Sequence, residues 1–220
     1  MKYEKPTRLS DPGSDFSPEE LNRILSKKDA ELDWADFDCL FSGKMPAGTY
    51  EEVRYYIPLA CAYIEKQGNA CNFFEHFSIW IGDNYARLKE DGLIAPVVSA
   101  FHALFRKATS SFDLESNRDH AVYPSACVSV DSMLEALFRL SPACPEFSPD
   151  VLFFELKENM SFVHAEWIVY ISTEMAMLSP ERIRSVISSS DYQKALAVIE
   201  ENIELILNDA IAYDFWNKRI

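Results

Sequence analysis

Apolar residues recur along this chain at intervals of three and four positions, which is the spacing of one face of an α-helix. No stretch of six positions alternates convincingly between apolar and polar residues, so little or no β-sheet is expected. The pattern therefore predicts an all-α protein of about eight helices. The segments that carry it lie near residues 49–68, 74–92, 96–108, 130–137, 149–158, 161–178, 181–189 and 191–216.

Capping residues place the beginnings of several helices. Ser17, Ser148 and Ser179 are each followed by a proline and an acidic residue, a combination that suits the first turn of a helix. Thr49 begins a capping-box pattern, and Pro58 is expected to kink or split the helix that follows. Such frequent starts indicate many short helices.

The segment 191–216 has the most regular pattern and is predicted to form one long helix. Three acidic residues, Glu200, Glu201 and Glu204, lie away from its apolar positions and are expected to point outward. The apolar positions, spaced alternately by four and three, are expected to form a buried seam. They are Tyr192, Leu196, Ile199, Ile203, Ile206, Ala210 and Tyr213.

Pairs of predicted helices recur about every 40 residues, which is the scale of helical-hairpin repeats. A short solenoid-like stack of helical hairpins is one predicted arrangement. An irregular helical bundle is the other, because the repeats share no sequence motif. Residues 1–16 are predicted to be a flexible polar arm, and residues 17–220 a single helical domain. Prolines within residues 141–149 mark a candidate boundary between two lobes of that domain.

The 220 residues include 35 acidic and 21 basic side chains, which gives a net charge of −14. Residues 1–110 hold 17 acids and 13 bases, whereas residues 111–220 hold 18 acids and 8 bases. Such a charge repels nucleic acid and anionic membranes, and it attracts basic proteins. No apolar run is long enough to span a membrane and no secretory signal is visible, so a cytoplasmic location is expected.

The cysteines are odd in number, and none lies in a C-x-x-C pair. We interpret them as reduced and mostly buried thiols of a protein in a reducing cytosol. The five are Cys39, Cys61, Cys71, Cys127 and Cys144.

Two residue pairs have the spacing of metal sites, but each lacks the rest of its ligand set. His164 and Glu166 have the H-x-E spacing of zinc deaminases, which also need two later cysteines, and none follows Cys144. We interpret this pair as lying on a helix surface. Glu155 and Glu158 would share a helix face, yet no second pair completes a dinuclear site. The sequence therefore predicts no catalytic residue, metal or cofactor, and the chain is not expected to be an enzyme.

Two acidic segments supply the candidate partner-binding residues. Residues 29–38 hold five acids interleaved with two aromatics, Trp34 and Phe37, and on a helix these aromatics would share a face with Phe41, flanked by the acids. The acids of the last predicted helix add charge without an obvious apolar anchor. The candidates are Asp33, Trp34, Asp36, Phe37, Asp38, Glu200, Glu201 and Glu204.

These features lead to one functional hypothesis and two alternatives. The hypothesis is an acidic helical interaction protein that binds a basic protein partner, in one version an immunity-type protein that neutralises a bacterial toxin. The first alternative is a helical scaffold or adaptor that binds a peptide in a groove. The second is an enzyme whose carboxylate or small-molecule site is assembled in space without a linear motif.

Overall fold

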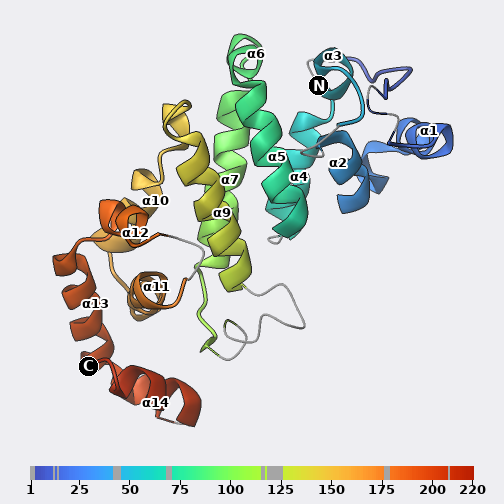
Figure 1. Ribbon diagram of the computed structural model, residues 1–220. Coiled ribbons are helices and arrows are strands. Elements are labelled where there is room, and N and C mark those ends of the chain that lie inside the picture. The colour runs from blue at the N-terminus through green and yellow to red at the C-terminus, as the bar shows by residue number, and fades with distance from the viewer. Residues whose placement is uncertain are drawn as a thin grey trace. The chain divides into compact units, whose positions relative to one another are not determined.

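A computed structural model describes residues 3–11, 13, 15–41, 46–67, 71–114, 117, 126–175, 179–207 and 209–220 (Figure 1). Over these ranges the regular structure consists of thirteen α-helices and three short 3-10 turns, without a strand. The all-α prediction is confirmed, and the expected number of about eight helices is too low for the described residues. None of the described helices is long and apolar enough to cross a membrane.

The chain forms two compact units. Unit 1 comprises Met1–Leu104 and Pro142–Glu146, and unit 2 comprises Phe105–Ser141 and Phe147–Ile220. The proline-containing segment that the sequence marks as a candidate boundary thus includes two of the points at which the chain passes between units.

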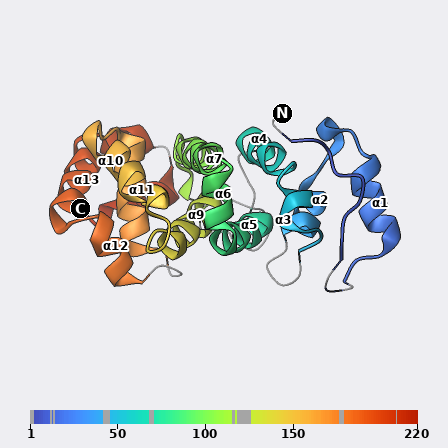
Figure 2. The same ribbon diagram turned by 90° about the horizontal axis from the view of Figure 1, so that it is seen from above.

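Unit 1 has its core between short helices that follow one another along the chain. Helix α2 packs against α5, where the ring of Phe41 lies edge-on to Phe77 at 4.8 Å and to Trp80 at 5.0 Å. Figure 2 shows α1 at one end of this unit and α5 and α7 towards the other. Its helical elements are α1 (Pro18–Ser26), η1 (Asp29–Glu31), α2 (Trp34–Phe41), α3 (Tyr50–Val53), α4 (Ile57–Gln67), α5 (Cys71–Asp83), α6 (Tyr85–Glu90) and most of α7 (Ile94–Ala108).

Two of the predicted helices in unit 1 are split. The pattern over 49–68 divides into α3 and α4, with Pro58 in the first turn of α4, as the proline predicts. The pattern over 74–92 divides at Asn84, whose side-chain amide donates to the Trp80 carbonyl at 2.9 Å. Gly92 follows α6 with φ of +71°, a left-handed conformation that favours glycine.

The described part of the predicted N-terminal arm lies against unit 1. Leu9 is buried, and the Ser10 backbone N–H and hydroxyl both donate to the carboxylate of Glu52 at 3.0 Å. The hydroxyl of Tyr3 donates to the carbonyl of Asp91 at 3.3 Å. The two ends of residues 3–10 are thus bonded to other parts of unit 1: Tyr3 to Asp91, just after α6, and Ser10 to Glu52 in α3.

Unit 2 is built around α11, a mostly apolar helix that is buried on every side. Seven consecutive residues from Ala165 to Ile171 are buried, which requires neighbours all around the helix. Helix α13 is its main neighbour, and α10 and α12 also contact it. The elements that lie wholly in unit 2 are α9 (Ala126–Leu140), α10 (Asp150–Glu158), α11 (Phe162–Thr173), α12 (Pro180–Val186), α13 (Ser189–Glu201), η3 (Ile203–Ile206) and α14 (Ala210–Asn217), while η2 (Pro145–Phe147) joins the two units.

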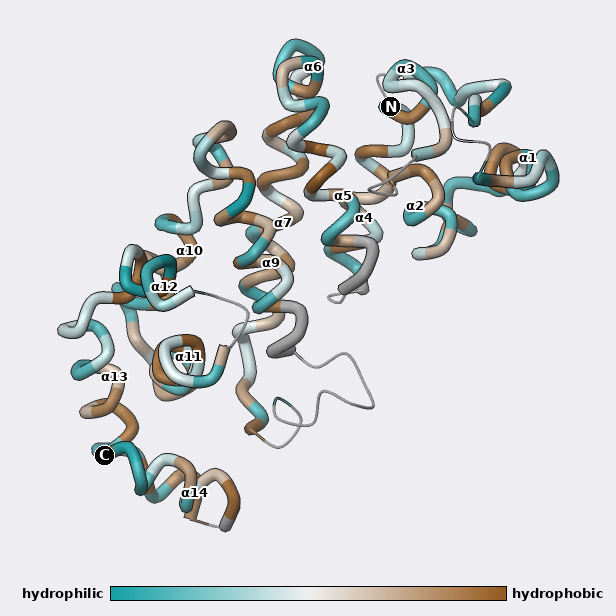
Figure 3. Tube along the Cα trace, in the orientation of Figure 1, coloured by the Kyte–Doolittle hydropathy of each residue, from teal (hydrophilic) through white to brown (hydrophobic). Residues whose placement is uncertain are grey.

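The prediction of one long helix over 191–216 is wrong. Helix α13 ends before Asn202, whose side-chain amide donates to the Val198 carbonyl at 2.8 Å. Helix α14 begins after Asp209, which accepts the N–H groups of Ile211 and Ala212 at 3.0 and 2.9 Å and so acts as its N-cap. The apolar seam is interrupted for this reason, and α14 carries both polar and apolar segments in Figure 3.

Candidate functional site

The first acidic segment begins with a reciprocal cap on α2. One oxygen of the Asp33 carboxylate accepts the backbone N–H groups of Ala35 and Asp36, at 3.0 and 3.3 Å. The Asp36 carboxylate in turn accepts the backbone N–H of Asp33 at 2.9 Å. The two acids thus occupy the roles of N-cap and third residue, and their first task is to start the helix.

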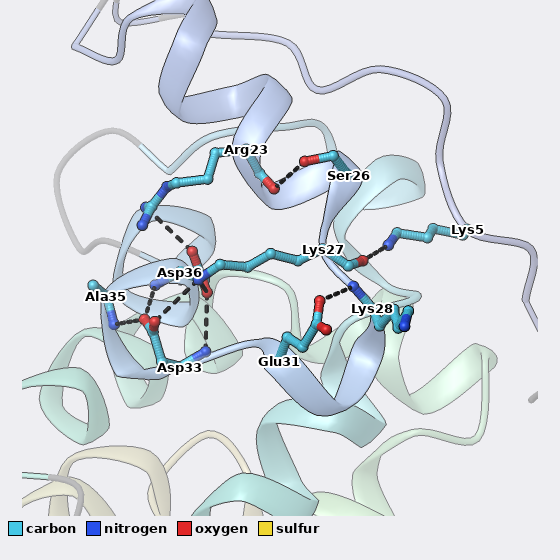
Figure 4. A network of polar contacts seen from close by, with 9 residues as sticks. All are labelled: Lys5, Arg23, Ser26, Lys27, Lys28, Glu31, Asp33, Ala35 and Asp36. Atoms are coloured by element: carbon cyan, nitrogen blue, oxygen red, sulfur yellow. Dashed lines mark hydrogen bonds and ion pairs between the residues drawn. The ribbon is translucent and has the colours of Figure 1, made fainter.

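Cations from the preceding helix neutralise these two acids (Figure 4). Asp36 is fully buried, with the Lys27 ammonium 2.5 Å and the Arg23 guanidinium 3.2 Å from its oxygens. Lys27 also lies 3.0 Å from Asp33. The hydrogen bond to Asp36 raises the pKa of Lys27. Although burial acts in the opposite direction, the hydrogen bond from Lys27 lowers the pKa of Asp33.

The remaining candidates in this segment are also engaged within unit 1, with one exception. Asp38 lies 2.9 Å from Nδ1 of His76, and Phe37 is buried against Tyr63 with ring centroids 5.3 Å apart. Trp34 is 57% exposed. The expectation that Trp34, Phe37 and Phe41 share one apolar face is therefore wrong, because Trp34 is the first residue of α2 and points away from the core.

The second acidic segment has no such neutralisation. Glu200, Glu201 and Glu204 are exposed, and none of their side-chain carboxylates has a hydrogen bond or ion pair with another described residue. From Ala195 to Asn217 the sequence has five acids and no lysine, arginine or histidine. The carboxylates of Glu200, Glu201 and Glu204 are therefore accessible to an external partner.

Apolar side chains are exposed beside these acids. Leu205 is 65%, Leu207 57% and Ile211 48% exposed. They lie in or next to the break between α13 and α14, where the chain turns before the apolar pattern can continue into the core. We refer to Glu200, Glu201, Glu204, Leu205, Leu207 and Ile211 as the C-terminal acidic surface.

A continuous-helix reading of the sequence missed the apolar part of this surface. The signal that could have found it is the pair Asn202 and Asp209, since both residue types favour helix ends. Two helix ends seven residues apart would have placed Leu205 and Leu207 in the segment that joins two α-helices, instead of within one long α-helix.

No group of three metal-binding side chains occurs in the described part of the chain. Glu155 accepts two hydrogen bonds from Arg106, at 2.8 and 2.6 Å, so it is engaged in an ion pair. The prediction that Glu166 lies on a helix surface is wrong: this carboxyl is buried in α11, a helix enclosed on all sides.

The thiols that the structure describes are unreactive in character. Cys39, Cys61 and Cys144 are free and buried, in agreement with the prediction, while the side chains of Cys71 and Cys127 lie outside the described residues. Burial raises the pKa of both Cys39 and Cys61 to about 12. These two thiols are therefore protonated near neutral pH and are poor nucleophiles.

A groove of about 640 Å³ lies within unit 2, between the end of α11, helix α12 and the start of α13. Its apolar lining includes Met175, Ile183 and Ile187, and Glu174 and Arg184 contribute charged groups. A groove of this size falls in the range of small-molecule and short-peptide sites.

Comparison of the chain with protein-family models, with curated proteins and with solved structures finds no match.

Proposed function

We propose that this protein is an interaction protein that binds a basic protein partner through its C-terminal acidic surface. The observation that carries the proposal is the contrast between its two acidic segments. Asp33 and Asp36 pair with Lys27, and Asp38 lies against the ring of His76. The side chains of Glu200, Glu201 and Glu204, in contrast, pair with no cation among the described residues.

The composition of the surface matches what protein recognition needs. Unpaired carboxylates attract a basic partner over long distances and raise its association rate. Exposed leucines beside them can be desolvated on contact and then slow dissociation. Leu205 and Leu207 supply this anchor next to Glu204.

A basic toxin is the form of partner that the charge of the whole chain favours. An inhibitor that covers a basic active site needs charge and shape, and it needs no catalytic group of its own. We accordingly propose that the protein acts by binding and has no enzymatic activity.

A peptide-binding adaptor is the second candidate function. The groove between α11, α12 and α13 favours it, because apolar side chains line the groove and charged groups accompany them. The two functions use different parts of unit 2 and can be separated by substitution.

The test is capture of basic proteins from a lysate of the native cell by three forms of the chain. One is wild type, one carries Glu200→Lys, Glu201→Lys and Glu204→Lys, and the control carries Glu65→Lys, Asp83→Lys and Glu90→Lys. All six positions are exposed acids, and both triple variants change the net charge equally. We expect wild type and control to retain the same basic protein and the first variant to lose it.

Two outcomes of this capture experiment would contradict the proposal. Equal loss in both variants would mean that overall charge, rather than this surface, drives capture. Retention by both would remove the C-terminal acidic surface from the interface, and substitutions in the groove, such as Ile183→Asp, would then test the adaptor function.

A further inference from the structure

The carboxyl group of Glu166 in α11 is buried and contacts α14, the helix that carries Ile211 of the C-terminal acidic surface. The indole Nε1 of Trp216 donates to Oε1 of Glu166 at 3.1 Å, and both side chains are buried. This bond joins α14 to α11. It is the one hydrogen bond that the described residues make to the Glu166 carboxyl.

The donor of this hydrogen bond, the Trp216 indole, packs against other aromatic rings. The ring of Trp216 lies 5.7 Å from that of Phe112 and 4.6 Å from that of Phe215, and the ring of Phe215 lies 6.4 Å from that of Tyr170. A carboxylate among aromatic rings loses its hydration without gaining a counter-ion. The neutral acid is favoured in such a place.

The charges around Glu166 act in the same direction. Burial raises the pKa of Glu166, the hydrogen bond from Trp216 lowers it, and the negative field of Asp209, at the start of α14, raises it, so that the pKa lies at about 8. No cation among the described residues offsets these effects, because the charges of neighbouring helices pair with one another. Two of these ion pairs join different helices: Lys157 of α10 lies 3.5 Å from Asp191 of α13, and Arg182 of α12 lies 2.7 Å from Glu135 of α9. The other two involve cations near the C-terminus: Lys218 lies 2.5 Å from Asp214, and Arg219 pairs with Glu174 at the end of α11.

Helix α14 has two faces with different tasks. Ala212, Phe215 and Trp216 are buried on the inner face, whereas Ile211 on the outer face belongs to the C-terminal acidic surface. The position of that surface therefore depends on how α14 packs.

We propose that protonation of Glu166 controls how firmly α14 packs on α11, so that the neutral acid holds the helix in place and ionisation releases it. The release also displaces Ile211 from the leucines of the C-terminal acidic surface. The effect on the C-terminal acidic surface rests on the proposed function, whereas the packing of α14 can be measured without a partner.

The direction of the pH effect follows from proton linkage. The packed state holds the Glu166 proton more tightly than the exposed state, in which the ordinary pKa is near 4.5. Raising the pH from there towards about 8 therefore favours the exposed state, by at most about tenfold per pH unit for one linked proton. Above the higher pKa the effect levels off.

Hydrogen–deuterium exchange of α14 amides at pH 6.5, 7.5 and 8.5, corrected for the intrinsic exchange rate, tests the proposal. Wild type should lose protection over residues 211–217 as the pH rises, by up to about tenfold per unit. Glu166→Gln keeps an acceptor for Trp216 but cannot ionise, so its protection should not follow the pH. Glu200→Gln removes an exposed acid from the same unit and should behave as wild type. Equal pH dependence in wild type and Glu166→Gln would overturn the inference.

A carbon-13 NMR titration of the Glu166 carboxyl in wild type provides a second measurement that needs no folded variant. A midpoint near 8 supports the inference, and a midpoint near the ordinary value overturns it. If exchange over α14 is independent of pH while the Glu200, Glu201 and Glu204 reversal still abolishes capture, this inference fails and the proposed function stands. If exchange follows the pH while capture survives that reversal, the proposed function fails and the control of α14 packing stands.

Discussion

At the scale of single residues, Asp36 and Glu201 show how differently a carboxylate is used in the two units. Asp36 is buried between Lys27 and Arg23 and starts a helix, whereas Glu201 is exposed without a partner among the described residues. Both lie in acidic stretches of sequence. Charge alone therefore did not indicate which acids were available to a partner.

Removing the cation beside Asp36 should destabilise unit 1. Lys27→Met leaves Arg23 as the one counter-ion, among the described residues, of the fully buried Asp36 carboxylate. We therefore expect the free energy of unfolding to fall by about 3 kcal/mol, the lower end of the range for a broken buried ion pair. Lys28→Met is the matched control, because Lys28 is exposed, and its effect should stay within about 0.5 kcal/mol. Urea denaturation of both variants checks this, and similar losses would show that the ion pair contributes little.

The sequence indicated the acids of the site but could not indicate their pairing. Lys27 lies nine positions before Asp36, directly after the end of α1, so the pair forms only when the end of α1 meets α2. His76 lies farther still from Asp38. Such a contact depends on the folded structure, and the spacing of the two residues along the sequence does not predict it.

At the scale of helices, capping residues indicated most reliably where a helix begins. Ser17, Thr49 and Ser179 each accept the backbone N–H three residues on and begin a helix, as predicted. The ends at Asn84 and Asn202 were missed. Asparagine is tolerated inside helices, and only the bond from its side chain to a carbonyl four residues earlier marks these breaks.

The break after α13 changes which apolar residues stabilise unit 2. Ile199 is fully buried, so Ile199→Ala should lower the free energy of unfolding by about 2–5 kcal/mol. Leu205→Ala should change it by no more than about 0.5 kcal/mol, because that side chain is exposed. Thermal or urea melts compare the two, and a large cost at Leu205 would mean that this leucine packs into the core.

At the scale of the whole molecule, negative charge is unevenly available for recognition. The net charge is −14, yet many acids of unit 1 pair with cations within that unit. The run of 23 residues from Ala195 to Asn217 has no basic residue at all. If the proposed function is correct, we expect a basic partner to be drawn most strongly to this part of unit 2.

The acids and the leucines of the C-terminal acidic surface should affect different rate constants of binding. Replacing Glu200, Glu201 and Glu204 by glutamine should slow association with the captured basic protein and weaken its salt dependence, because long-range attraction acts on the association rate. Leu205→Ala should mainly speed dissociation. Surface-plasmon resonance at several salt concentrations measures both rates. The assignment fails if the glutamine variant and Leu205→Ala alter the same rate to the same extent.

The enclosed helix α11 also has a consequence for biosynthesis. Its seven consecutive buried residues emerge from the ribosome before α13, the helix that covers them most extensively. Until residues near 200 have been made, the nascent chain presents a strongly apolar helix to its surroundings. Unit 2 is thus expected to depend on chaperones during translation, and a chain that stops before Ser189 should aggregate in the cell.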